Sequence, residues 1–87
     1  SDVFEWSMNA WGEARLVDRR HLRGTPSLEH PDLVEFGVSS DGRMTQIIAI
    51  NHKNEDELLR ELVKRRVSVD GKEDLLLDPT TDLEQLL

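Results

Sequence analysis

The chain has 87 residues, no cysteine and a formal net charge of −7. This length suits a single small core, so residues 1–87 are expected to form one domain. The composition excludes disulfides, zinc–thiolate sites and thiol catalysis, and it fits a reducing, cytoplasmic location. The acidic charge opposes indiscriminate binding to nucleic acid or anionic membranes, and no apolar run approaches the ~20 residues that cross a bilayer.

The first predicted element is a helix over residues 9–23. Asn9 would be its N-cap, and Gly24 would lie just past its end. A short strand is the alternative, because Gly12 would cost about 1 kcal/mol against alanine inside a helix. Ser1 is not a natural start, which makes residues 1–8 a candidate tag-derived or disordered segment.

Two strands over residues 33–38 and 44–50 are predicted to form a hairpin. Apolar residues alternate in the first, and the end of the second is apolar on both faces, which is typical of an interior strand. A two-residue Asp-Gly turn would place Phe36 opposite Ile47. A three-residue loop with a bulge at the glycine would place Phe36 opposite Gln46. The more apolar pairs favour the two-residue turn.

Residues 55–66 are predicted to form an amphipathic helix packed on the sheet. Asn54 and Glu57 have the spacing of an N-terminal capping box. The apolar stripe that would face the sheet consists of Leu58, Leu59, Leu62 and Val63.

Two more strands are predicted over residues 67–69 and 75–77, joined at an Asp-Gly turn, followed by a short helical tail over 79–87. A right-handed crossover would connect Ile50 to Val67. The predicted order is αββαββ. The fold class is α+β, a small, mostly antiparallel sheet with one amphipathic helix on a face.

Four arginines are candidate interaction residues: Arg15, Arg19, Arg20 and Arg23. On a helix they would form a ridge able to contact phosphates or an acidic protein. The alternative is a solvated helix face whose arginines form salt bridges with neighbouring carboxylates. No recognised nucleic-acid motif accompanies them, so nucleic acid is the less favoured partner.

The C-terminal leucines Leu83, Leu86 and Leu87 are the second candidate interaction site. They would either be buried in a homodimer or fold back over an open face of the sheet.

Three histidines, His21, His30 and His52, titrate near neutrality and lie on different predicted elements. With Asp32 they would be the only material for a metal site or an acid–base pair. No two-histidine spacing on a helix face supports such a site, so we expect no catalytic residue, no metal and no cofactor.

The sequence therefore favours a non-enzymatic protein-interaction or regulatory module of adaptor or inhibitor type, binding another protein or a second copy of itself. Its mark would be an acidic face of Glu29, Asp32, Glu35, Asp70, Glu73 and Asp74. The alternatives are a nucleic-acid-binding regulator that uses the arginine ridge and a small histidine- or metal-dependent enzyme.

Overall fold

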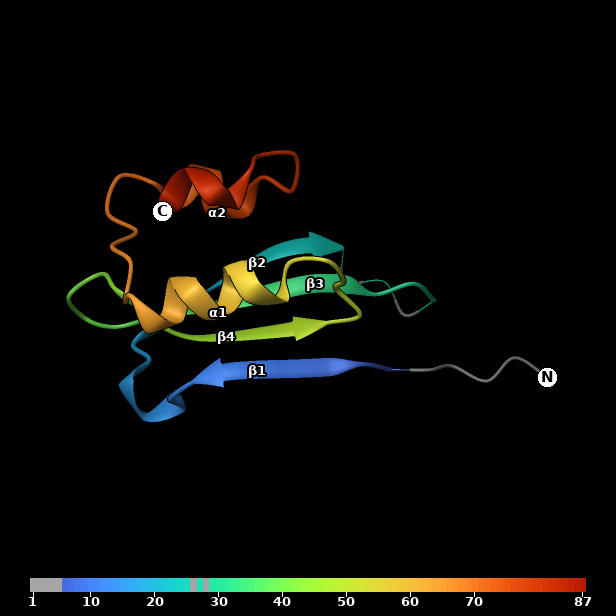
Figure 1. The fold of residues 1–87 in the computed structure, drawn as a ribbon, viewed down its shortest axis with the longest axis horizontal. Coiled ribbons are helices and arrows are strands. Elements are labelled where there is room, and N and C mark those ends of the chain that lie inside the picture. Colours follow the sequence, from blue (N-terminus) through green and yellow to red (C-terminus); the bar gives the residue numbers. More distant parts are fainter. Residues whose placement is uncertain (1–5, 26, 28) are drawn as a thin grey trace.

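The fold is a four-stranded antiparallel sheet with α1 and α2 on one side (Figure 1), in a computed structural model that describes residues 6–25, 27 and 29–87. The strands, which lie in the order β1-β4-β3-β2, are β1 (Met8–Gly12), β2 (Arg19–Thr25), β3 (Asp32–Val38) and β4 (Met44–Ile50). The helices are α1 (Asp56–Lys64) and α2 (Glu73–Leu77), with the short 3-10 helices η1 (Ala14–Leu16) and η2 (Leu83–Leu86). The predicted α+β class is confirmed.

The β3–β4 hairpin is confirmed, and Phe36 pairs with Ile47 as the more apolar register predicts. The loop nevertheless has three residues, because the Ser39 amide donates to the Arg43 carbonyl oxygen at 2.9 Å. The register then skips Thr45 at a bulge and so returns to the apolar pairs. The predicted pairing is therefore correct, whereas the predicted turn length is wrong.

The helix predicted over residues 9–23 is wrong, because this segment forms β1, η1 and β2. The strand alternative is correct for its first part. Gly12 ends β1 with a φ of +93°, and an added Cβ would lie 2.1 Å from the Thr45 carbonyl oxygen. Pairing along both edges of the apolar strand β4 satisfies its backbone groups, and this long-range requirement outweighs the local helical pattern.

The segment after α1 also differs from the prediction. Ser68 forms an isolated bridge to Arg43, and residues 75–77 belong to the helix α2 rather than to a strand. The Asp70-Gly71 turn leads into this helix. The four named strands all precede α1 and α2, so the predicted αββαββ order is wrong. All pairings between these strands are antiparallel, so the predicted crossover is wrong as well.

Helix α1 is the predicted amphipathic helix. Leu59 and Leu62 are fully buried, and Leu58 and Val63 pack at the edge of the core. The predicted capping box is wrong, because the N-cap is Glu55 without a side-chain cap bond, and Asn54 has a left-handed φ of +74°.

The core lies between the sheet and the helices, and every one of α1, α2 and η2 contributes leucines to it. Its buried residues are Val34, Phe36, Val38, Met44, Ile47, Ala49, Leu59, Leu62, Val69, Leu76, Leu83 and Leu86. The helical tail predicted at the C-terminus is thus present as η2 and is part of the core. Asp82 caps it by accepting a hydrogen bond from the Glu84 amide at 3.0 Å.

Ser7 and Met8 are both paired with the end of β4 and the residue after it. Met8 pairs with Ile50, and Ser7 and Asn51 exchange two hydrogen bonds of 2.6 and 2.7 Å. The expectation of disorder over residues 1–8 is therefore wrong for Ser7 and Met8. Residues 1–5 lie outside the described part of the chain, and their origin as a tag stays a prediction.

Candidate functional site

The predicted arginine ridge does not exist, because its residues lie on η1 and β2 rather than on one helix. Arg15 is exposed and pairs with Glu13 at 2.8 Å. Arg20 donates to Glu35 at 2.9 Å and to Gln46 at 3.0 Å across the sheet. Arg19 and Arg23 alternate with Arg20 along β2 and therefore point to the opposite face.

Arg23 is 6% exposed and forms the most extensive polar contact in the described chain. Its Nη1 donates to the carbonyl oxygens of Leu75 at 2.9 Å and Asp78 at 2.7 Å. Its Nη2 donates to the carbonyl oxygen of Thr81 at 2.5 Å. A cation at the C-terminal end of α2 complements the helix dipole. Arg23 therefore fastens the C-terminal segment to β2 and is not free to bind a partner.

The predicted leucine site divides into two parts. Leu83 is fully buried and Leu86 is 5% exposed, both in the core of the same chain. The interpretation in which the tail folds back over the sheet is therefore correct for these two residues. Leu87 is 52% exposed and remains a surface residue.

His52 lies between two carboxylates. Its Nδ1 is 2.6 Å from Asp32 at the start of β3, and its Nε2 is 2.5 Å from Glu55 at the start of α1. Partial burial lowers the pKa of His52, but the hydrogen bonds to Asp32 and Glu55 and the charges of these carboxylates raise it, and the net result is a pKa above the usual value. The structure thus brings His52 and Asp32 together, as the histidine hypothesis required.

The other two histidines lie elsewhere. His21 is on β2 beside Phe36, and its buried Nε2 has no hydrogen-bond partner among the described residues, whereas His30 is exposed before β3. Within residues 6–25, 27 and 29–87, no group of three or more His, Cys, Asp or Glu side chains is arranged to hold a metal ion.

The predicted acidic face is wrong. Asp32 and Glu35 are three positions apart on β3, so their side chains point to opposite faces of the sheet. Each is engaged, Asp32 with His52 and Glu35 with Arg20.

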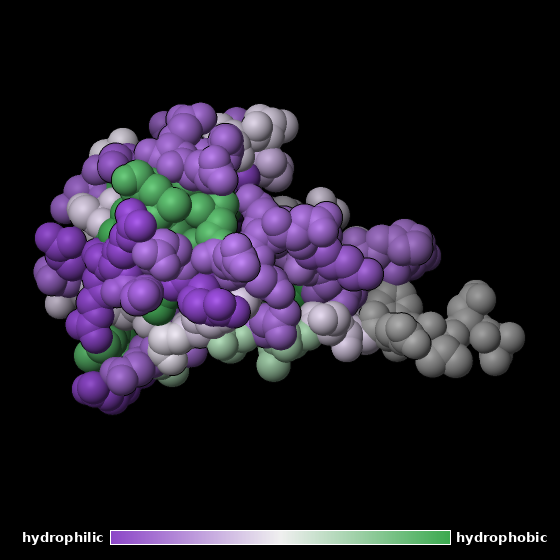
Figure 2. All heavy atoms as spheres, viewed as in Figure 1, coloured by the Kyte–Doolittle hydropathy of each residue, from purple (hydrophilic) through white to green (hydrophobic). Residues whose placement is uncertain are grey.

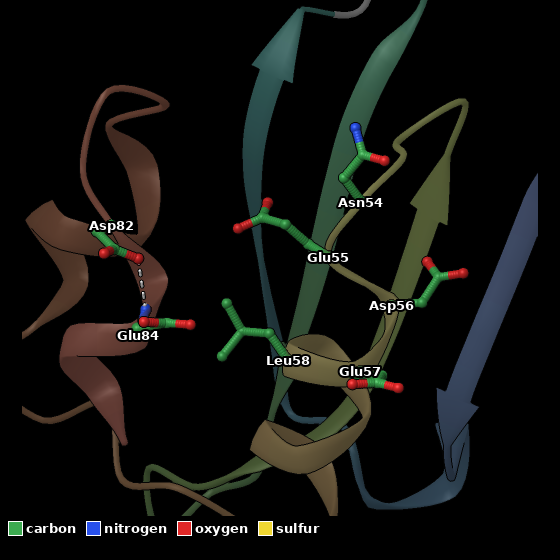
Figure 3. Close-up of a pocket in the computed structure, with 7 residues that line it drawn as sticks. All are labelled: Asn54, Glu55, Asp56, Glu57, Leu58, Asp82 and Glu84. Atoms are coloured by element: carbon green, nitrogen blue, oxygen red, sulfur yellow. Dashed lines mark hydrogen bonds between the residues drawn. The ribbon is translucent and has the colours of Figure 1, made fainter.

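Acidic residues gather instead around a hollow of about 500 Å³ between the start of α1 and the C-terminal segment. In Figure 3, Leu58 points from α1 toward the C-terminal segment and Glu84 points back toward α1, whereas Asp56 points away. The helix-covered side is otherwise largely hydrophilic, with an apolar area between α1 and the C-terminal segment (Figure 2).

The other face of the sheet carries an apolar surface. The register places Met8, Ile50 and Leu33 in one row across β1, β4 and β3. Because side chains alternate along a strand, this row lies on the face opposite to the buried Val34 and Ala49. Both α1 and α2 pack on the Val34 side, so the row is not covered by either helix.

A second row on this face runs through Ala10, Ile48, Glu35 and Leu22. Met8 is 68% exposed and Leu22 is 43% exposed. We call the apolar members of the two rows the open face: Met8, Ala10, Leu22, Leu33, Ile48 and Ile50.

The open face is bounded at its other end. Val17, which follows η1, packs over Gly37 so closely that an added Cβ there would lie 2.6 Å from Val17 Cγ2. Arg20, Glu35 and Gln46 form a hydrogen-bonded polar group beside it. The result is an apolar surface with a polar border, an arrangement typical of interaction sites.

The sequence held one signal for the open face. The end of β4 is apolar on both faces, which predicts that both are covered, yet the described chain covers the Ile47 side and leaves Ile48 and Ile50 half-buried. The sequence did not indicate that Met8 and Leu22 lie on the same face as Ile48 and Ile50, because this depends on the strand order. None of the helices in the described part is long and apolar enough to span a membrane.

Comparison with known families gives a match over the whole chain. The sequence model of the family described as "Reductase C-terminal" matches residues 1–87, the whole chain. Among curated proteins, no match is found.

Proposed function

This chain belongs to the reductase C-terminal family, and from that premise we propose that it is a non-catalytic docking domain of a reductase, bound to the remainder of the enzyme through its open face. The observation that carries the proposal is the apolar surface that α1 and α2 leave uncovered on the sheet. Burying Met8, Leu22 and their neighbours against another domain would give the favourable transfer energy expected for apolar side chains.

The polar groups support a structural rather than a chemical role. Arg23 is surrounded by carbonyl oxygens of its own chain, and His52 is held between two carboxylates. We propose that the reaction, and any cofactor that it needs, belong to other domains of the reductase. The domain itself would then bind protein and would require no cofactor of its own.

The test compares two lysine substitutions in the isolated chain and in the complete reductase that carries it. Leu22→Lys places a charge on the open face opposite Glu35, and Leu87→Lys places one on an exposed leucine of the C-terminus. In the isolated chain, at a concentration low enough to keep it monomeric, each should change the free energy of unfolding by less than about 0.5 kcal/mol. In the complete reductase only Leu22→Lys should lower the melting temperature and increase proteolysis between the domains.

Two outcomes would contradict the proposal. Equal behaviour of Leu22→Lys and Leu87→Lys in the complete reductase would show that the open face does not bind its other domains. Reductase activity of the 87-residue chain alone would show that the domain is catalytic.

A further inference from the structure

The loop between β4 and α1, residues 51–55, joins three parts of the molecule. Asn51 binds Ser7 at the start of β1 through two hydrogen bonds. His52 binds Asp32 at the start of β3, and its second ring nitrogen binds Glu55 next to α1. One loop therefore fixes the positions at which β1, β3 and α1 begin.

This loop holds two residues in an unfavourable backbone conformation. Asn51 has a φ of +50° and Asn54 a φ of +74°, on either side of the histidine. Asparagine adopts the left-handed region more readily than most other residues with a side chain, and such a conformation persists where surrounding contacts hold it. The two bonds of the His52 ring are the contacts that lie between them.

The two bonds also specify a protonation state. A neutral imidazole has one N–H donor, whereas the ring of His52 contacts carboxylate oxygens through both nitrogens. Only the imidazolium form donates at both positions. Removing a proton turns one of the two hydrogen bonds into a contact between a nitrogen lone pair and a carboxylate.

We propose that His52 is a proton-dependent latch, whose imidazolium form holds residues 51–55 in place and thereby anchors Ser7 and the start of β1. In its neutral form the ring keeps one carboxylate partner, and the loop and the Ser7–Asn51 hydrogen bonds loosen. The proposal concerns the isolated chain and does not depend on docking to a reductase.

The surrounding charges agree with this role. A hollow of about 170 Å³ lies next to His52, and the charged residues that line it are Asp32, Glu55 and Arg23. The guanidinium of Arg23 is bound to the C-terminal segment. Lys53 is exposed on the same loop. The two carboxylates are therefore the charges in direct contact with the ring, and both favour the protonated form.

The sign of the pH dependence follows from these contacts. The pKa of His52 in the folded chain lies above its ordinary value, which is about 6.5 in an unfolded chain. The contribution of the latch is thus complete below pH ~6.5 and is lost as the pH rises through the higher, folded pKa.

The experiment is amide hydrogen exchange at Asn51, measured by NMR between pH 6 and 9 and corrected for the intrinsic exchange rate. The Asn51 amide donates to the Ser7 carbonyl oxygen. In the wild-type chain its protection should fall as the pH rises over this range, because the proton that holds the loop is lost. In His52→Gln it should be low and independent of pH. His30→Gln, at an exposed histidine, is the matched control and should behave like the wild type.

A second measurement keeps the test decisive if His52→Gln does not fold. The ring pKa of His52 is read from its own NMR titration in the wild type and in Asp32→Asn, which removes one charged acceptor and keeps the ring. The expected result is a pKa above 6.5 in the wild type and a lower one in the variant. Wild-type protection that stays constant from pH 6 to 9, or an Asp32→Asn pKa equal to that of the wild type, would overturn the latch.

Discussion

One guanidinium connects the C-terminal segment to the sheet. The partners of Arg23 lie 52 to 58 positions further along the chain, and they are carbonyl oxygens of α2 and of the segment after it, together with the Thr81 hydroxyl. Carbonyl groups at a helix end lack partners within the helix, and burying them unpaired is costly. Arg23 supplies donors to these carbonyl oxygens together with Thr81, whose hydroxyl donates to the Leu75 carbonyl oxygen at 2.6 Å and whose amide donates to that of Asp78 at 3.2 Å.

Replacing Arg23 by methionine should therefore destabilise the fold. The substitution keeps much of the apolar stem but removes the guanidinium donors from the carbonyl oxygens of Leu75, Asp78 and Thr81, of which the first two keep a hydrogen bond from Thr81. We expect the free energy of unfolding, measured by urea denaturation, to fall by about 3 kcal/mol. Arg15→Met, at a salt bridge that is exposed on both sides, is the control and should change it by less than about 0.5 kcal/mol. Equal effects of the two substitutions would refute the structural role of Arg23.

Two glycines allow steric crowding to be separated from backbone preference. Gly12 and Gly71 both have positive φ values, +93° and +73°. An added Cβ would lie 2.1 Å from the Thr45 carbonyl oxygen at Gly12 but would have open space at Gly71. Gly71→Ala should cost about 1 kcal/mol, and Gly12→Ala about 3 kcal/mol, because β1 must also move away from β4. Thermal unfolding of both variants measures the difference, and similar melting temperatures would contradict it.

Single residues were predicted by type but not by role. The sequence singles out Arg23 as a cation and His52 with Asp32 as titratable groups, and the structure places all three at polar contacts. The partners could not be predicted. Those of Arg23 are mainly backbone carbonyl groups more than fifty positions away, and the second partner of His52 is Glu55, which the sequence pattern assigned to the start of a helix. Residue type limits the chemistry, whereas the fold decides which partner is present.

At the scale of elements, local patterns predicted the structures that local contacts stabilise. The β3–β4 hairpin and helix α1 combine a clear hydrophobic period with turn signals nearby, and both are confirmed. The first part of the chain has a helical spacing of apolar residues but forms β1 and β2, because β4 and β3 offer free edges. The run of leucines in α2 suits a strand or a helix, and length alone did not separate the two.

The C-terminal segment provides the prediction that belongs to this scale. Leu83 of η2 is completely buried, whereas Leu87, four positions later, is half exposed. Leu83→Ala removes a core side chain and should lower the free energy of unfolding by about 3 kcal/mol, while Leu87→Ala should change it by less than about 0.5 kcal/mol. Urea denaturation at two protein concentrations supplies the measurement. A loss for Leu83→Ala that disappears at high concentration would instead assign this leucine to an interface between copies.

At the scale of the whole molecule, the two faces of the sheet differ in kind. One is covered by α1, α2 and η2 and contains the core. The other is covered by η1 at one end, and at its opposite end the exposed Met8 lies beside the half-buried Ile50 and Leu33. The sequence alone could not reveal this asymmetry, because it depends on the strand order and on which face receives the helices.

An uncovered apolar face should have a measurable consequence when the chain is isolated. Without the other domains of a reductase, the open face contacts either solvent or a second copy of the chain. Association of two copies would bury its apolar side chains. Light scattering should therefore give a mean mass that rises above that of one chain as the concentration increases. High salt should not weaken this association, because it does not depend on ion pairs.

Leu22→Lys should keep the mass of a monomer, and Leu87→Lys should follow the wild type. If Leu87→Lys alone prevented association, the contact would lie at the C-terminus rather than on the sheet. A wild-type chain that stays monomeric at all concentrations would mean that the exposed apolar side chains are too dispersed to drive self-association, and binding in the complete reductase would then have to draw on the polar border of Arg20, Glu35 and Gln46 as well.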